Sequence, residues 1–417
     1  AGGRAVRAPT DAGPGELTQR QLALRNATRR SKRSIATIAL LASGTFLVVA
    51  IAAFRLDATQ DAAQRTSGTG GFALIGESAL PVSHDLNTER GRDFYGLNPR
   101  TVEGASFVPF RVREGDEASC LNLNKAQTPK VVGVNPELLA GREAFTFAAL
   151  ADGVDSAAPW LALRRGELQP AGSAPLADDE IPCIGDFNSL MWALQKKVGE
   201  VIEMTDELGR PLKLRIVGAV KNSILQGNLV IDEEEFLKRF PGESGYRMFL
   251  IDAPADKVAD VSAALSRGMS DIGLELTPAV ERMNAFNAVQ NTYLSTFQVL
   301  GGLGLLLGSA GLGVVVLRNV LERRGELGLM LAVGFRRREL QRMILVEHLF
   351  LLLLGLGLGL VTAVIAILPA VLSPGGEIPW RSLPLTLVGV LLNGLVWTWL
   401  ATRVALRGEL LATLRNE

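Results

Sequence analysis

Four long uncharged segments constrain what this chain can fold into. The first, residues 34–54, reads SIATIALLASGTFLVVAIAAF and contains no charged side chain. A helix needs about 20 apolar residues to cross a hydrocarbon core of roughly 30 Å. Three further runs of this kind follow at residues 292–317, 349–376 and 383–402. We therefore predict a membrane α-helical protein with four transmembrane helices.

The basic residues indicate how these helices are oriented. Short segments rich in arginine and lysine stay on the cytoplasmic side of a membrane. Such residues precede the first span, separate the second from the third and follow the fourth: Arg4, Arg7, Arg20, Arg25, Arg29, Arg30, Lys32, Arg33; Arg318, Arg323, Arg324, Arg336, Arg337, Arg338, Arg342; Arg403, Arg407, Arg415. We expect both termini in the cytoplasm and residues 55–291 on the opposite side.

Residues 55–291 are long enough to form a domain with its own core. KLRIVGAV at 213–220 and YRMFLID at 246–252 are typical of strands, residues 255–269 of an amphipathic helix, and 272–277 of a closing strand. A short helix is expected over 233–240, after Asp232. Strands and helices in this order predict an inserted α+β extracytoplasmic domain.

Composition excludes several classes of function. The 43 basic and 43 acidic residues cancel, which gives no electrostatic reason to expect nucleic acid as a partner. The chain has no Gly-Lys dipeptide, so it lacks the loop that cradles ATP phosphates beside a reaching lysine. The contiguous Ser83, His84 and Asp85 cannot converge into a catalytic relay. We expect no enzyme, no catalytic residue and no metal or cofactor site.

Two small clusters leave alternatives open. Cys120 and Cys183 are the only cysteines; on the extracytoplasmic side a disulfide between them is permitted, and two buried free thiols fit equally. The run Asp178, Asp179 and Glu180 fits either a cation site or a solvated surface.

Glycine spacing predicts close helix packing. Gly304 with Gly308, and Gly355 with Gly359, have the small-xxx-small spacing that lets helix backbones approach. Glycine is also simply frequent in membrane helices. Residues 281–298 contain no Gly or Pro, so one helix is expected to continue from the outside domain into the second span.

The segment between the second and third spans carries the strongest functional signal. Residues 322–340 read ERRGELGLMLAVGFRRREL, in which apolar residues alternate with charges and Gly334 is suited to end a helix. This pattern fits a helix lying at the membrane surface or one that docks onto a cytoplasmic partner.

Residues 318–347, with the Glu-Arg-Arg-x-Glu-Leu-Gly-Leu-Met core and a glutamate before the third span, resemble the FtsX/MacB-type ABC transporter permease family. The order of spans and the closing LRGELLATLRNE are similar too. RIVGAVKNSILQG at 215–227 and FPGESGYRMFLI at 240–251 resemble that family's periplasmic core domain.

The resemblance implies a multi-pass protein of the bacterial plasma (inner) membrane with this organisation: cytoplasmic segment 1–33, spans 34–54, 292–317, 343–372 and 383–402, extracytoplasmic domain 55–291, coupling loop 318–342, tail 403–417, and an FtsX-like permease domain over 292–410. Longer family members carry further spans upstream, so this chain is also a candidate C-terminal half.

The implied function is a permease subunit that passes ATP-driven motion to the outside domain for export, lipoprotein extraction or envelope regulation. Its implied partners are a cytoplasmic ABC ATPase, a second permease subunit, identical or different, and membrane lipid. The expected ATPase contacts are Glu322, Arg323, Arg324, Glu326, Leu327, Met330, Arg336 and Arg337. The alternative is a membrane-anchored sensory or scaffold protein with an extracytoplasmic binding domain.

Overall fold

The computed structural model describes residues 31–53, 62–116, 128–166, 176–177, 179–372 and 382–406. These residues form two units, one helical and one built on a mixed sheet. Among the described residues, the helical unit comprises 31–53, 293–371 and 382–406, and the sheet unit comprises those between 62 and 292.

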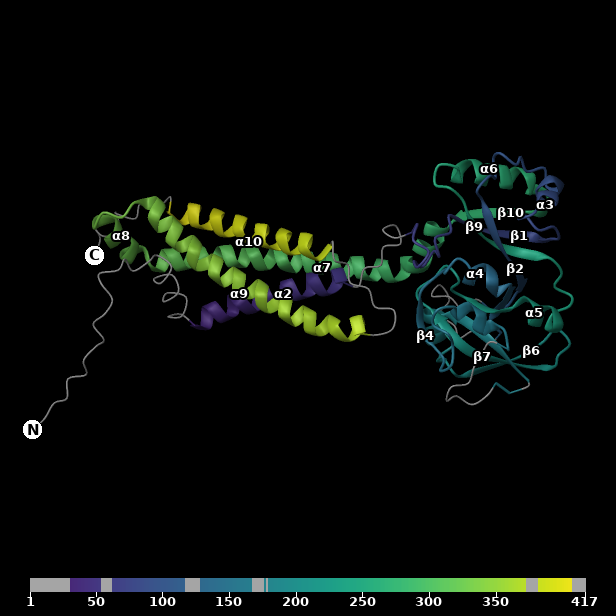
Figure 1. Ribbon diagram of the computed structural model, residues 1–417. Coiled ribbons are helices and arrows are strands. Elements are labelled where there is room, and N and C mark those ends of the chain that lie inside the picture. Colours follow the sequence, from purple (N-terminus) through teal and green to yellow (C-terminus); the bar gives the residue numbers. More distant parts are fainter. Residues whose placement is uncertain are drawn as a thin grey trace, which may run out of the picture. The chain divides into compact units, whose positions relative to one another are not determined.

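The helical unit contains long apolar helices, drawn in purple, green and yellow in Figure 1. Its described helices are α2 (Ser31–Ala53), α7 (Ala279–Glu322), whose first residues belong to the other unit, α8 (Arg324–Ala332), α9 (Arg337–Leu372) and α10 (Ser382–Leu406). The four predicted spans fall on α2, α7, α9 and α10. Within the described residues, one helix, Arg338–Pro369, is long and apolar enough to cross a membrane, and Ile38–Ile51 and Leu387–Arg403 are shorter apolar helices. The count of four spans stays a prediction.

The second unit is a ten-stranded mixed sheet with short helices on its faces (Figure 1). Its strands are β1 (Leu74–Val82), β2 (Ser106–Arg113), β3 (Lys130–Val134), β4 (Phe147–Leu150), β5 (Glu180–Asp186), β6 (Val201–Thr205), β7 (Pro211–Val220), β8 (Asn228–Asp232), β9 (Tyr246–Asp252) and β10 (Leu274–Pro278). Their order is β10-β1-β9-β2-β3-β8-β5-β7-β4, and β6 also pairs with β7.

Helical segments in this unit are short. They are α3 (Glu89–Phe94), α4 (Pro136–Ala140), η1 (Pro159–Leu163), the π-helical turn η2 (Ser189–Ala193), α5 (Glu233–Arg239), α6 (Val258–Gly268) and η3 (Ser270–Ile272). Strands β3 and β8 pair in parallel, as do β5 and β7, while the other ladders are antiparallel. The sequence predicts an α+β domain, and the structure confirms a mixed domain of helices and sheet.

The local predictions hold for most of these elements. Strand β9 has the predicted bounds, and β7 and α5 match the predicted positions to within a few residues. The closing strand begins two residues later than predicted, at Leu274. Gly273 takes a left-handed conformation with φ of 65° and ends the preceding turn, which delays the start of the strand.

Three buried clusters form the core of the sheet unit. One lies along a single face of the sheet and includes Val108, Val132 and Val230. The opposite face is divided: α6 covers one half with Val261 and Leu265, and α5 covers the other with Phe236, together with Phe240 directly after the helix. Alternate strand residues point to opposite faces; accordingly, neighbouring residues of β3, such as Val131 and Val132, belong to different clusters.

The first turns of α7 are anchored in this core. Ala279 and Met283 are buried in the cluster that lies along the sheet, and Phe286 is also buried. Apolar burial of this kind contributes about 1.5–3 kcal/mol for each large side chain. The α/β unit therefore holds the beginning of α7 firmly.

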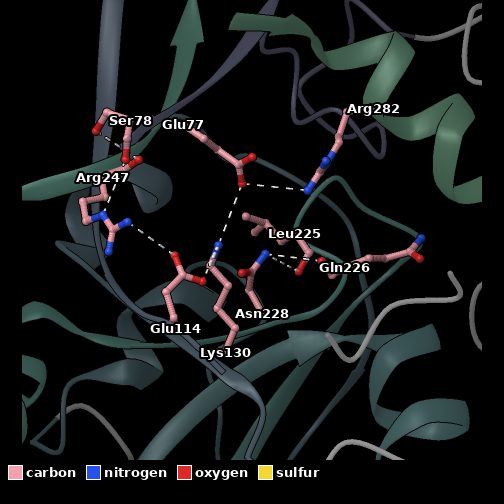
Figure 2. Close-up of polar contacts among 9 residues, drawn as sticks. All are labelled: Glu77, Ser78, Glu114, Lys130, Leu225, Gln226, Asn228, Arg247 and Arg282. Atoms are coloured by element: carbon pink, nitrogen blue, oxygen red, sulfur yellow. Dashed lines mark hydrogen bonds and ion pairs between the residues drawn. The ribbon is translucent and has the colours of Figure 1, made fainter. Parts of the chain in front are cut away.

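A chain of ion pairs lies beside this anchor (Figure 2). Arg282 Nη2 lies 3.8 Å from Glu77 Oε1, and the same oxygen lies 3.9 Å from Lys130 Nζ. Glu114 continues the chain, at 3.5 Å from Lys130 and 3.9 Å from Arg247. These pairs are partly exposed, so each contributes at most about 1 kcal/mol, and the apolar contacts dominate the anchoring of α7.

Cys183 lies in β5 and is a completely buried free thiol. Burial raises the pKa of this thiol, which makes it unreactive in the folded chain. Cys120, the other cysteine of the candidate disulfide, lies outside the described residues.

A buried carboxylate holds together the loops that follow the parallel strands β5 and β7. Asp186 is fully buried, and its Oδ2 accepts hydrogen bonds from Ser223 N at 2.6 Å and Ser223 Oγ at 2.9 Å. Its Oδ1 accepts from Asn188 N at 2.9 Å. At the end of the loop after β7, Asn228 Nδ2 of β8 donates to the carbonyls of Leu225 and Gln226 (Figure 2). Burial raises the pKa of Asp186 to about 6, although the hydrogen bonds from Ser223 oppose this shift.

We predict that the difference in folding stability between Asp186→Asn and wild type depends on pH. Because the pKa of Asp186 is raised, its carboxyl group binds a proton more tightly in the folded chain than in the unfolded chain. Protonation of Asp186 therefore stabilises the fold at low pH, and this stabilisation is lost as the pH rises through 6. Relative to wild type, Asp186→Asn should gain on the order of 3 kcal/mol between pH 4 and pH 7.5. Thermal unfolding of the full chain in detergent measures this difference.

The matched control is Asp256→Asn, because Asp256 is an exposed carboxylate. Its stability difference from wild type should be constant over the same pH range. A constant difference for Asp186→Asn as well would contradict the assignment.

Candidate functional site

The segment from the end of α7 to the start of α9 forms the candidate site. Helix α7 ends at Glu322, and α8 begins at Arg324. Arg323 lies between them with φ of −102° and ψ of 13°, outside the helical region. This single non-helical residue allows the chain to change direction.

Helix α8 ends in a specific hydrogen-bonded motif. Gly334 N donates to Leu331 O at 3.1 Å, and Phe335 N donates to Met330 O at 3.0 Å. Gly334 has φ of 110°, a conformation that residues with a Cβ rarely adopt. These bonds define a Schellman cap, so the predicted role of Gly334 in ending the helix is confirmed.

The inner face of α8 packs against its neighbouring helices. Leu327 is 1% exposed and belongs to a cluster with Val320 of α7 and Leu340, Met343 and Ile344 of α9. Met330 is half-buried at the edge of this cluster. These contacts determine which side of α8 faces outward.

The outer face of α8 and the turn after it expose large apolar side chains. Leu329 is 60% exposed, Val333 is 74% exposed and Phe335 is 49% exposed. Leu329 and Val333 are four residues apart and therefore share a helix face. A surface of this kind is suited to bind a protein partner.

Charged groups border this apolar surface. Glu322 accepts from Arg318 Nε at 2.9 Å, and Glu326 is exposed. Arg336 is also exposed, and its backbone N donates to Glu339 Oε2 at 2.8 Å, where α9 begins. The apolar residues with this charged border have the composition of an interface, an apolar centre with a polar rim.

Arg323 points inward rather than toward this surface. Its side chain is 11% exposed, and its Nη1 lies 3.3 Å from Glu347 Oε2 of α9. Its Nε donates to Glu326 Oε2 at 3.1 Å.

The structure thus brings the predicted contact residues to one segment but divides them between two faces. Glu322, Glu326 and Arg336 lie on the exposed side, Leu327 and Arg323 face inward, and Met330 lies between. The side chains of Arg324 and Arg337 lie outside the described parts. Sequence analysis did not identify Leu329, Val333 and Phe335 as contact residues. The signal for two of them is helical spacing: if Leu327 is buried, Leu329 and Val333 lie on the opposite side of the helix.

Two of the predicted packing glycines lie against α2. A Cβ added to Gly355 would lie 2.7 Å from Leu41 Cβ, and one added to Gly359 would lie 2.6 Å from Ala42 O. Only glycine permits this approach, because real Cβ atoms do not come so close. The surroundings of Gly304 and Gly308 lie outside what the structure describes.

The acidic run offers no open cation site among its described members. Glu180 makes two 2.7 Å bonds with the guanidinium of Arg215, and Asp179 lies 2.8 Å from Lys213 Nζ. Hydrogen bonds from Arg215 hold the pKa of Glu180 below its ordinary value. Asp178 lies outside the described residues. In the parts the structure describes, no cluster of three His, Cys, Asp or Glu side chains could hold a metal ion.

Residues 299–410 match the family model described as FtsX-like permease C-terminal. This part of the chain, which contains the whole candidate site, is an FtsX-like permease domain, and the resemblance predicted from the sequence is confirmed.

The chain is homologous to ABC transporter permeases. An uncharacterized ABC transporter permease from Methanocaldococcus jannaschii is 24% identical over 58% of this chain and 63% of that relative. The macrolide export ATP-binding/permease protein MacB from Azoarcus sp. (strain BH72) is 28% identical over 40% of this chain and 25% of its own. MacB from Escherichia coli (strain K12) is 30% identical over 28% of this chain and 18% of its own. The match spans less than two thirds of each of these relatives.

The periplasmic region of MacB from Actinobacillus actinomycetemcomitans is similar in structure. The two are 14% identical in sequence, and the aligned part covers 54% of this chain and 95% of the MacB region, with a TM-score of 0.25.

We predict that Gly359→Ala destabilises the helical unit. The added Cβ would collide with the backbone of α2, and overpacking of this kind costs about 1–3 kcal/mol. The midpoint of thermal unfolding in detergent should fall.

The control is Gly357→Ala in the same helix, because a Cβ there would meet nothing within 4 Å. Its midpoint should stay the same or rise slightly, since alanine favours a helix more than glycine does. Equal midpoints for the two variants would contradict the close packing of α9 on α2.

Proposed function

We propose that this chain is a membrane permease subunit of an ABC transporter and that α8 docks onto a cytoplasmic ATPase. The observation that carries this proposal is the exposed apolar surface of Leu329, Val333 and Phe335 within the FtsX-like permease domain. The printed names of the relatives, an ABC transporter permease and an ATP-binding/permease protein, support the same class of partner. The chain itself has no phosphate-binding Gly-Lys motif, which is consistent with ATP being hydrolysed by another polypeptide or by a segment outside this sequence.

The proposed contact differs from the one expected from sequence. Leu329, Val333 and Phe335 would enter a groove of the ATPase, and Glu322, Glu326 and Arg336 would form the rim. Leu327 and Arg323 are buried within this chain, so they would shape the contact without touching the partner.

Helix α7 would carry the resulting movement. It is one helix from Ala279 to Glu322, anchored at its start in the core of the α/β unit and followed at its end by Arg323 and α8. We place the α/β unit on the extracytoplasmic side, because arginines flank the other ends of the apolar helices. A displacement of α8 would then act on the α/β unit without a pore through this chain.

We predict that Leu329→Asp weakens ATPase binding at least tenfold. A charge placed at the centre of an apolar interface is typical of substitutions that cost about 2 kcal/mol or more. The test is affinity capture of the tagged full chain from native membranes, with the captured ATPase identified by mass spectrometry through its Gly-x-x-x-x-Gly-Lys-Ser/Thr segment.

Leu208→Asp is the matched control, since Leu208 is 66% exposed in the α/β unit. It should capture as much ATPase as wild type. Equal capture by Leu329→Asp and wild type would rule out α8 as the docking helix.

A further inference from the structure

A buried ion pair links the start of α8 to α9. Arg323 Nη1 and Glu347 Oε2 are 3.3 Å apart, and their side chains are 11% and 6% exposed. The two residues are 24 positions apart in sequence and lie on different helical segments. Arg323 is also the residue at which α7 gives way to α8. The pair therefore joins the bend between α7 and α8 to α9.

On one side, Arg323 also contacts the exposed carboxylate of Glu326 at 3.1 Å, and the buried residues of the neighbouring helix turns are apolar. The buried cluster at this place contains Val320, Leu327, Leu340, Met343 and Ile344. Removing two charges from water costs several kcal/mol each, and their attraction repays this only with good geometry. Apolar side chains at both positions would often be as stable. Stability alone therefore gives no reason for charges at this point.

A buried pair does specify one arrangement of the helices. If α8 shifted by a turn along α9, Glu347 would be left buried without the cation of Arg323, at a cost of several kcal/mol, while Arg323 would keep its pair with Glu326 of α8. The neighbouring buried residue His348 has a different role, because its Nδ1 lies 2.9 Å from Ile344 O in its own helix. Among these buried polar groups, the pair is the one that crosses between segments.

We propose that Arg323 and Glu347 are positioning residues that hold α8 in one register on α9. Each acts through the other, and neither touches the partner that docks on α8. The consequence rests on the proposed function: with α8 held in this way, a push on Leu329 and Val333 moves α9 and the end of α7 together. Without the pair, α8 would move by itself, and α9 and the end of α7 would not move with it.

The test is hydrogen exchange of the α8 backbone amides, residues 324–333, in the full chain in detergent. Glu347→Gln removes the carboxylate of α9 that pairs with buried Arg323 and leaves this cation paired with Glu326 of α8, so α8 loses its charged link to α9 and its exchange should accelerate about tenfold or more. Arg323→Gln should do the same. Arg323→Lys keeps the charge beside Glu347 and should retain most of the protection.

Two further variants distinguish positioning from general stability. Arg323→Met combined with Glu347→Leu should restore the midpoint of thermal unfolding, while α8 continues to exchange faster than in wild type. Arg318→Gln is a control that breaks the ion pair between Arg318 and Glu322 in the last turn of α7. The side chain of Arg318 is 70% exposed, so this variant should leave hydrogen exchange in α8 unchanged.

Unchanged α8 exchange in Glu347→Gln would overturn the proposal. Equal effects of Arg323→Lys and Arg323→Gln would also overturn it, because charge would then not be what holds α8. This measurement needs no ATPase, so its failure is separate from a failure of Leu329→Asp to affect ATPase capture.

Discussion

The packing of α8 between the end of α7 and the start of α9 determines the surface that this chain offers to a partner. Leu327 is buried against Val320 and Ile344, and a helix turns by about 100° per residue, so Leu329 and Val333 must face away. The cap at Gly334 then ends the helix, and Phe335, directly after it, is also exposed. A different packing of the same nine residues would present a different set of side chains.

Two buried charged groups are satisfied in different ways in the two units. In the helical unit, Glu347 is compensated by the cation of Arg323. In the α/β unit, Asp186 has hydrogen-bond donors from Ser223 and Asn188 and a pKa raised to about 6. Both arrangements join segments distant in sequence. In each case a buried carboxylate restricts its segment to one position, because leaving it without a partner would be costly.

Helix α7 has different surroundings along its length. At its start, Ala279 and Met283 are part of the core under the sheet, and Arg282 contributes to a weak chain of ion pairs. At its end, Val320 packs on α8 and α9. This continuity suits the mechanical role that we propose for the chain, since a helix with packed ends moves as one body more readily than a loop does.

The sequence by itself determined the local elements and the class of protein. The bounds of β9, the end of α8 at Gly334 and the apolar helices follow from side-chain periodicity, glycine conformation and hydropathy, which act over a few residues. The FtsX-like signature also lies in one continuous segment. Tertiary structure alone decided that β5 pairs in parallel with β7, that Gly359 meets Ala42, and that Arg323 turns inward to Glu347 instead of outward to a partner. These contacts join residues far apart in the chain, and their energies depend on burial and distance, which no local pattern of residues encodes.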